Sequence, residues 1–272
     1  MGQNSHIAWT DHTFNPWIGC QKVSSGCQNC YAEKLAKFHK WVDVWGADYK
    51  RTSEANWKQP IKWARQAVND RVIRRVFCAS LADIFDPNVP DEWRTDLYNL
   101  ILHTEEIGGL EWLILTKRPE NLPSMFESQM WGSTNIRLGV TVENQEMANK
   151  RIPELLNSWS GKNFVSYEPA LEEVNFRYYL NGCPELRDVL LNFDDQDSEW
   201  VQTTPPIQWV ICGSESGTNA RPFDIDWARS VRDQCQSANV PFFLKQMPID
   251  GKLTILPELD GKAWKQFPKE RP

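Results

Sequence analysis

Short apolar runs alternate with helix-like amphipathic stretches along most of the chain, and this alternation constrains the fold more than any other feature. The runs, at residues 74–79, 111–116, 136–142, 163–166, 207–212 and 241–245, are rich in Val, Ile, Leu and Phe, as buried parallel strands are. Helices are expected at 91–106, from Asn144 onward and at 224–239. The sequence therefore predicts an α/β fold built from βαβ units, a parallel (β/α) barrel that is complete or partial.

Chain length and net charge limit the number of domains and the kinds of binding partner. Its 272 residues suit a single barrel domain over 1–272, and the acidic, irregular stretch at about 176–206 is expected to be an insertion. A net charge of −6 gives no sign of a broad basic surface and weakens the case for nonspecific duplex binding, although it leaves room for a local basic groove. Because no apolar run is long enough to span a bilayer and no secretory signal is visible, we expect a cytoplasmic protein without a membrane segment.

Three of the seven cysteines, Cys20, Cys27 and Cys30, fall within eleven residues in a C-x6-C-x2-C pattern. Thiolates on one short loop can surround a soft metal centre. A structural zinc site requires four protein ligands, whereas a [4Fe–4S] cluster held by three cysteines leaves one iron open to another ligand, such as S-adenosylmethionine. Zinc remains an alternative, with His12 or His39 as the fourth ligand, and so does ordinary packing of the three thiols. We expect the other cysteines to pack as small apolar residues.

Polar side chains follow the predicted strands, where a parallel barrel gathers them at one mouth. Glu168, Ser214 and Glu215 follow two of the strands and offer a hydroxyl and two carboxylates, suited to an amino group or a ribose. Lys117 and Arg118 follow another strand and offer positive charge for a carboxylate or a phosphate. The alternative for each is an ordinary turn residue or a solvated charge. These five residues are the candidate cofactor-binding set.

Several motifs together resemble a known family. They are SSGCQNCYAE, ILTKRPE, LGVTVENQ, FVSYEPAL and the long block WVICGSESGTNARPFDIDWARSVRDQCQSANVPFFLKQ. The chain is similar over roughly 7–246 to the phage-associated, radical-SAM-like three-Cys-motif proteins, first noted in mycobacteriophages and also found in bacteria. The resemblance implies a radical-SAM/TIM-barrel-like fold, a three-cysteine cluster and a partner protein encoded nearby. The chain departs from the commonest radical-SAM spacing, C-x3-C-x2-C, by three residues between the first two cysteines.

Two classes of function follow from these observations. In the first, the chain is a radical SAM enzyme that binds a [4Fe–4S] cluster through the three cysteines and cleaves S-adenosylmethionine to act on an unknown substrate, nucleic acid or a precursor of it. In the second, it is a cluster-bearing or zinc-stabilised protein without catalysis, which binds or senses a partner in a phage-associated two-protein system. Metal content and S-adenosylmethionine turnover separate the two classes.

Overall fold

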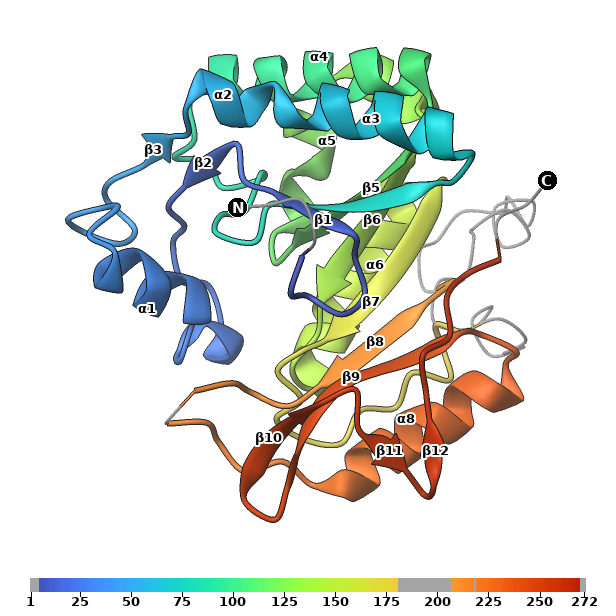
Figure 1. Cartoon of the computed structure of the whole chain (residues 1–272). Helices are drawn as coiled ribbons and strands as arrows, with labels where there is room; N and C mark the ends of the chain where they lie inside the picture. Colours follow the sequence, from blue (N-terminus) through green and yellow to red (C-terminus); the bar gives the residue numbers. More distant parts are fainter. Residues whose placement is uncertain (1–4, 181–206, 218, 270–272) are drawn as a thin grey trace, which may run out of the picture. The chain divides into compact units, whose positions relative to one another are not determined.

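Strands and helices alternate along the described chain, which comprises residues 5–180, 207–217 and 219–269 of a computed structural model (Figure 1). The chain divides into two compact units, Met1–Gly139 and Val140–Pro272. Most of the predicted insertion, from residue 181 to residue 206, lies outside the described residues.

The first unit carries the cysteine motif and the strands that precede and follow it. Its elements are β1 (His12–Phe14), β2 (Trp17–Ile18), η1 (Ser25–Cys27), α1 (Tyr31–Phe38), β3 (Lys50–Arg51), α2 (Glu54–Trp57), α3 (Gln59–Asp70), β4 (Arg74–Cys78), α4 (Asp91–Ile107), β5 (Leu110–Thr116), η2 (Pro119–Asn121), α5 (Leu122–Met125) and η3 (Ser128–Gly132). β4 pairs in parallel with β1 on one side and with β5 on the other. β2 and β3 form a separate antiparallel pair. The cysteine motif therefore begins directly after the short strand β2.

The second unit carries the remaining strands. β6 (Ile136–Thr141) contains the boundary between the units, and α6 (Gln145–Ser158), β7 (Lys162–Tyr167), β8 (Val210–Gly213), α8 (Ile225–Ser237), β9 (Phe242–Ile249), β10 (Lys252–Ile255), β11 (Glu258–Leu259) and β12 (Lys262–Ala263) follow. β7, β8 and β9 pair in parallel, and β10 joins β9 in the antiparallel sense. β11 and β12 form a small hairpin.

The strand order of the main sheet is β1-β4-β5-β6-β7-β8-β9-β10, which follows the order of the chain. Each of the six apolar runs coincides with one of these strands, from β4 to β9. Sequential parallel strands with intervening helices are the pattern of a (β/α) barrel. Because the order begins at β1 and ends at β10 without returning, the predicted fold is present in its partial form.

Side-chain caps begin two of the predicted helices. The side chains of Asn144 and Asp224 accept backbone N–H groups at the starts of α6 and α8. α4 has no side-chain cap, because its cap residue is Pro90 and Asp91 is already the first helical residue. An acidic residue in the first turn still favours the helix through its dipole. Among the described residues, no helix is both long enough and apolar enough to cross a membrane.

A small apolar cluster packs against the cysteine motif and the helix that follows it. Ile18, Ala32, Ala36, Val42 and Leu81 are buried together, and Cys30, Trp41 and Trp45 pack against them. The two alanines belong to α1, so this helix approaches the core closely and exposes its larger side chains elsewhere. The core thereby fixes the helix that begins directly after the motif.

In the second unit, an ion-paired carboxylate ties the hairpin β11–β12 to helix α8. Asp260 accepts hydrogen bonds from Arg229 at 2.7 Å and from Arg232 at 2.5 Å. The hydrogen bonds from Arg229, followed by those from Arg232, lower the pKa of the Asp260 carboxyl to about 2. The hairpin is thus anchored by charge as well as by packing.

Candidate metal and cofactor site

The three cysteines of the motif are distributed over one loop between β2 and α1. Cys20 follows Gly19 at the end of β2, Cys27 is the last residue of η1, and Cys30 is the N-cap of α1. Gly19 has a φ of +130°, and a Cβ there would lie 2.7 Å from the backbone oxygen of Asp48. Only glycine fits this close approach, so Gly19 allows the chain carrying Cys20 to run against the loop before β3.

The thiols of the motif differ in exposure from the other described cysteines. Cys20 and Cys30 are partly exposed and Cys27 is buried, and all three are free thiols. Outside the motif, Cys78, Cys212 and Cys235 are fully buried, and burial raises the pKa of each thiol well above its ordinary value. This agrees with packing as small apolar residues. The seventh, Cys183, lies outside the described residues.

A buried arginine holds the Cys20 end of the loop. Arg118, only 4% exposed, pairs with the carboxylates of Asp83 and Asp86 at 3.1 Å each. Its Nη2 also donates to the backbone oxygen of Gln21 at 2.8 Å, and its Nη1 lies 3.7 Å from the sulfur of Cys20. We call these residues the Arg118 cluster. One guanidinium therefore connects two acidic residues after β4 with the loop that carries the first cysteine.

The carboxylate of Asp86 completes this connection from the other side. It accepts a hydrogen bond from the backbone N–H of Gln21 at 2.9 Å and another from the hydroxyl of Tyr49 at 3.0 Å. Burial opposes ionisation of Asp86, but the Gln21 hydrogen bond and the charge of Arg118 outweigh it and hold the pKa of the carboxyl below its usual value. Asp86 is therefore ionised at neutral pH and fixes both the loop and Tyr49.

The electrostatic surroundings of the thiols are mixed. Burial, aided by the charge of Asp83, raises the pKa of Cys20 to about 12, although Arg118 opposes the shift. The bond to Glu33 raises the pKa of the Lys22 ammonium, and Cys30 and Cys27 contribute further, so this cation lies near two of the sulfurs. Each end of the motif thus has its own cation. Positive charge beside thiolates favours their ionised, metal-binding form.

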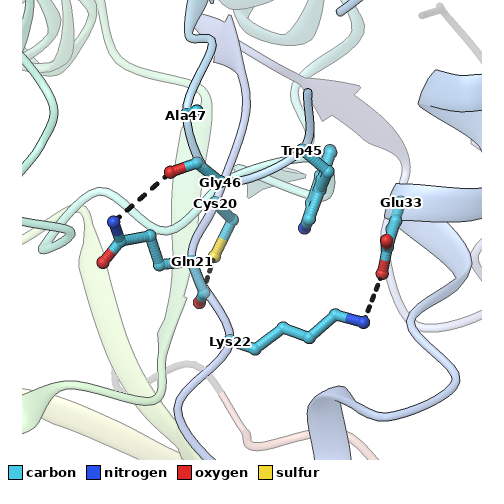
Figure 2. Close-up of a pocket in the computed structure, with 7 residues that line it drawn as sticks. All are labelled: Cys20, Gln21, Lys22, Glu33, Trp45, Gly46 and Ala47. Atoms are coloured by element: carbon cyan, nitrogen blue, oxygen red, sulfur yellow. Dashed lines mark hydrogen bonds and ion pairs between the residues drawn. The ribbon is translucent and has the colours of Figure 1, made fainter. Parts of the chain in front are cut away.

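A pocket of about 560 Å³ opens beside the first cysteine (Figure 2). Its lining residues are Cys20, Gln21, Lys22, Glu33, Trp45, Gly46 and Ala47. The ammonium of Lys22 pairs with the carboxylate of Glu33 at 2.7 Å, on the side of the pocket formed by α1. The pocket thus combines one thiol, one ion pair and one indole, which suits a ligand with both polar and planar parts.

The donor set of the motif fits an iron–sulfur cluster in its chemistry. Three free thiols lie on one loop, and two of them are partly exposed to an incoming group. In the arrangement of the described residues, no three His, Cys, Asp or Glu side chains are gathered closely enough to hold a metal ion. The loop supplies the ligand types, and their convergence on one centre belongs to the proposal below.

The predicted cofactor-binding residues fall into both units. In the first, Lys117 donates its backbone N–H to Asp83 at 3.0 Å, and the guanidinium of Arg118 is engaged in the Arg118 cluster. In the second, Glu168, at the end of β7, pairs with Lys245 of β9 at 2.5 Å. The structure therefore brings Arg118 and Cys20 together, and it gives Glu168 a lysine partner within its own unit.

Ser214 and Glu215 directly follow β8 and differ in how well their polar atoms are satisfied. Glu215 forms a two-pronged ion pair with Arg221, at 2.5 and 3.0 Å, and also accepts the Arg221 backbone N–H. The hydroxyl of Ser214 is buried and has no hydrogen-bond partner among the described residues. A buried hydroxyl without a partner is costly, so Ser214 is the member of the predicted set whose surroundings call for a ligand.

Sequence reasoning missed Asp86, a member of the Arg118 cluster, and Tyr49, whose hydroxyl donates to Asp86. Asp86 follows shortly after the apolar run at 74–79, and a carboxylate in this position was the available signal. Tyr49 carries no such signal, because its contact with Asp86 spans 37 residues.

Comparison with known proteins assigns the family. The family model described as "Protein of unknown function (DUF5131)" matches residues 4–268. The chain belongs to the DUF5131 family. No curated protein matches it.

The solved structures that resemble this DUF5131 protein are of spore photoproduct lyase. A mutant of that enzyme has a TM-score of 0.53 at 11% identity, over 89% of this chain and 77% of the other. The form complexed with dinucleoside spore photoproduct gives 0.52, with the same identity and coverage. A mutant with bound AdoMet and dinucleoside spore photoproduct gives 0.47 at 12% identity, over 85% of this chain but only 62% of that chain, less than two thirds. The similarity confirms the predicted fold class, a partial parallel (β/α) barrel like that of spore photoproduct lyase.

Proposed function

We propose that this DUF5131 protein is an iron–sulfur enzyme of the radical-SAM type, in which Cys20, Cys27 and Cys30 hold a [4Fe–4S] cluster. The observation that carries the proposal is a loop with three free thiols at the start of a chain whose fold resembles spore photoproduct lyase. The family likeness drawn from its motifs, to phage-associated three-Cys-motif proteins, supports the same assignment. Six free thiols in the described chain suit a reducing cytoplasm, where we place the protein.

When bound, the cluster and S-adenosylmethionine would supply the electron and the cleavable sulfonium of radical chemistry. The residues of this chain would hold the cluster and orient the loop that carries its ligands. Arg118 and Asp86 fix the backbone at Gln21, and with it the position of Cys20. Lys22 balances negative charge near Cys27 and Cys30.

The predicted cofactor-binding residues have distinct tasks in this proposal. The buried hydroxyl of Ser214 gains the hydrogen-bond partner it lacks by meeting S-adenosylmethionine. The carboxylates of Glu168 and Glu215 attract its amino group or ribose, and Lys117 attracts its carboxylate. Arg118 was also assigned to this set, and its engagement with two aspartates gives it a supporting task as well.

The substrate remains open in this proposal, with nucleic acid or a precursor favoured. One of the structurally similar lyases is complexed with a dinucleoside, which motivates a test of nucleotide-containing substrates here. The family likeness also motivates a search for a protein partner encoded nearby, with which the chain would form a two-protein system.

Anaerobic reconstitution tests the proposal. We expect about four irons and four acid-labile sulfides per chain, the composition of the cluster, with an electron paramagnetic resonance signal that changes when S-adenosylmethionine is added. Under strong reduction the protein should release 5′-deoxyadenosine. Cys20→Ala, Cys27→Ala and Cys30→Ala should each lose iron and sulfide, whereas the buried Cys235→Ala should keep both.

Two results would count against the proposal. Zinc in place of iron and sulfide would favour the zinc-stabilised alternative. An intact cluster whose spectrum ignores S-adenosylmethionine, with no 5′-deoxyadenosine formed, would favour a binding or sensing protein without radical chemistry.

A further inference from the structure

Helix α1 carries a second apolar face in addition to the one that packs on the core. Ala32 and Ala36 are buried in the core cluster. Tyr31, Leu35 and Phe38 are 46, 38 and 80% exposed, at i, i+4 and i+7 spacing, and so form one stripe along the helix. At 100° per residue this stripe is centred well over 90° away from the alanines. It therefore points away from the core that anchors the helix.

Exposed apolar side chains are also frequent in the sequence segment that contains this helix. Of the 13 large apolar side chains that are exposed in the described chain, five fall within residues 23–44, the other two being Val23 and Val44 on the segments that flank α1. Single exposed apolar residues are ordinary, but a concentration of them marks an interaction surface.

The charge of this region is opposite to that of the whole chain. Residues 20–51 contain six Lys and Arg against three Asp and Glu, a net charge of +3, so the remainder of the chain carries −9. Lys34 and Lys37 lie on α1 and Lys40 follows it, all three exposed. Glu33 neutralises part of this charge by pairing with Lys22 and Lys37. A positive excess remains, which suits a polyanion rather than a neutral partner.

The aromatic member nearest the cysteines is held in place. The hydroxyl of Tyr31 donates to the backbone oxygen of Ser80 at 2.7 Å, so the ring is held in one position although the side chain is partly exposed. Tyr31 directly follows Cys30, and the stripe therefore begins beside a ligand of the proposed cluster. A fixed ring loses little freedom when a planar group stacks on it.

We propose that this face of α1 binds a single strand of nucleic acid, with bases stacked on Tyr31 and Phe38 and phosphates at Lys34, Lys37 and Lys40. Exposed aromatic rings beside lysines are the combination that single strands use, because unpaired bases offer their faces for stacking. That the strand is also the substrate rests on the proposed function, whereas its binding does not.

Fluorescence anisotropy with labelled DNA and RNA strands of roughly 12 nucleotides tests the proposal, a length within the usual site sizes. The full chain is used both as purified and after reconstitution. We expect single strands to bind more tightly than the duplex. With three lysine–phosphate contacts, the logarithm of the affinity should fall with the logarithm of salt concentration at a slope of about −2, and Lys34→Gln should reduce the slope by about 0.7. Phe38→Ala should weaken binding at least about fivefold, the lower limit for one stacked base.

Matched substitutions elsewhere serve as controls. Ile255→Ala removes another exposed apolar side chain, and Lys150→Gln removes an exposed lysine of α6, so both should leave the affinity unchanged. The proposal is overturned if no strand binds, or if Phe38→Ala and Lys34→Gln bind like the wild type. It is also overturned if Phe38→Ala instead abolishes binding to phosphatidylglycerol vesicles or dissolves a homodimer.

The two proposals can fail separately. Strand binding that depends on Phe38, without formation of 5′-deoxyadenosine, would support the surface and contradict the radical-SAM assignment. Formation of 5′-deoxyadenosine without strand binding would do the reverse.

Discussion

Replacing Arg118 with methionine should destabilise the first unit by about 3 kcal/mol. The substitution keeps most of the side-chain stem and removes the guanidinium from between two buried carboxylates, each 3.1 Å away. Asp83 is 5% exposed and Asp86 is fully buried, so water cannot replace the lost charge. Removing one partner of a buried ion pair typically costs about 3–5 kcal/mol.

The lower end of that range applies because both carboxylates keep other hydrogen bonds. Asp83 still accepts from the hydroxyl of Thr116 and the backbone of Lys117, and Asp86 still accepts from Gln21 and Tyr49. Arg118→Lys should recover part of the loss, because a single ammonium has the charge but not the planar fork that reaches both acids.

Urea unfolding of the metal-free protein, followed by the fluorescence of its 14 tryptophans, measures the loss. Hydrogen exchange at the Gln21 amide should also become faster, since the carboxylate that it binds is no longer anchored. The control is Arg118→Met combined with Asp86→Asn, which should be less destabilised than the two single losses added together. A loss for Arg118→Met of less than about 0.5 kcal/mol, the range of surface substitutions, would refute the reasoning.

Three further outcomes are expected. Gly19→Ala should lower the stability by about 1–3 kcal/mol and reduce iron loading, because the new Cβ meets a backbone oxygen and φ is positive there. Gly132→Ala, which has open space around it, should do neither, and urea unfolding and iron analysis compare the two variants. The stability difference between wild type and Asp260→Asn should be full above pH 4 and disappear as the pH falls toward 2, because the folded state favours the carboxylate; unfolding curves at several pH values check this. Because Ser214→Ala removes a buried hydroxyl that has no partner, it should leave the stability unchanged or raise it by about 1 kcal/mol. The same substitution should weaken S-adenosylmethionine binding in calorimetry, and unchanged binding would remove Ser214 from the site.

The sheet could be predicted from the sequence wherever a strand is apolar throughout. β4 to β9 are mostly buried, so each contains a run of apolar residues, as in the last three residues of β4. β1 was missed because its three residues include His12 and Thr13, which are buried yet polar. β10 was missed because its apolar residues, Leu253 and Ile255, alternate with polar ones instead of forming a continuous run.

Helix α3 shows a related limit of sequence patterns. Its buried face consists of Pro60, Trp63, Ala64 and Ala67, of which only Trp63 is a large apolar residue. Side chains this small allow close approach to neighbouring helices, which only the folded structure reveals.

The parts of the candidate site that are close together in sequence could be predicted, and those that depend on distant contacts could not. The cysteine motif is local in sequence, so its ligand types could be predicted directly. The surroundings of Arg118 could not, because its carboxylate partners lie 32 and 35 residues away in the chain. Sequence spacing alone presents an arginine after a strand as an arm for a ligand, whereas the structure uses it to hold two aspartates and a loop.

The contact between Arg118 and Cys20 has a consequence for the order in which the protein matures. The two residues are separated by 98 positions, and the chain between them includes β4, α4 and β5. During synthesis, the first cysteine emerges long before the arginine and the two aspartates that give it its place, and distant contacts of this kind form late because closing a long loop is slow. A metal centre delivered to the nascent chain would meet an unfixed loop. Under the proposed function, cluster loading is therefore expected to follow the folding of the first unit rather than to start it.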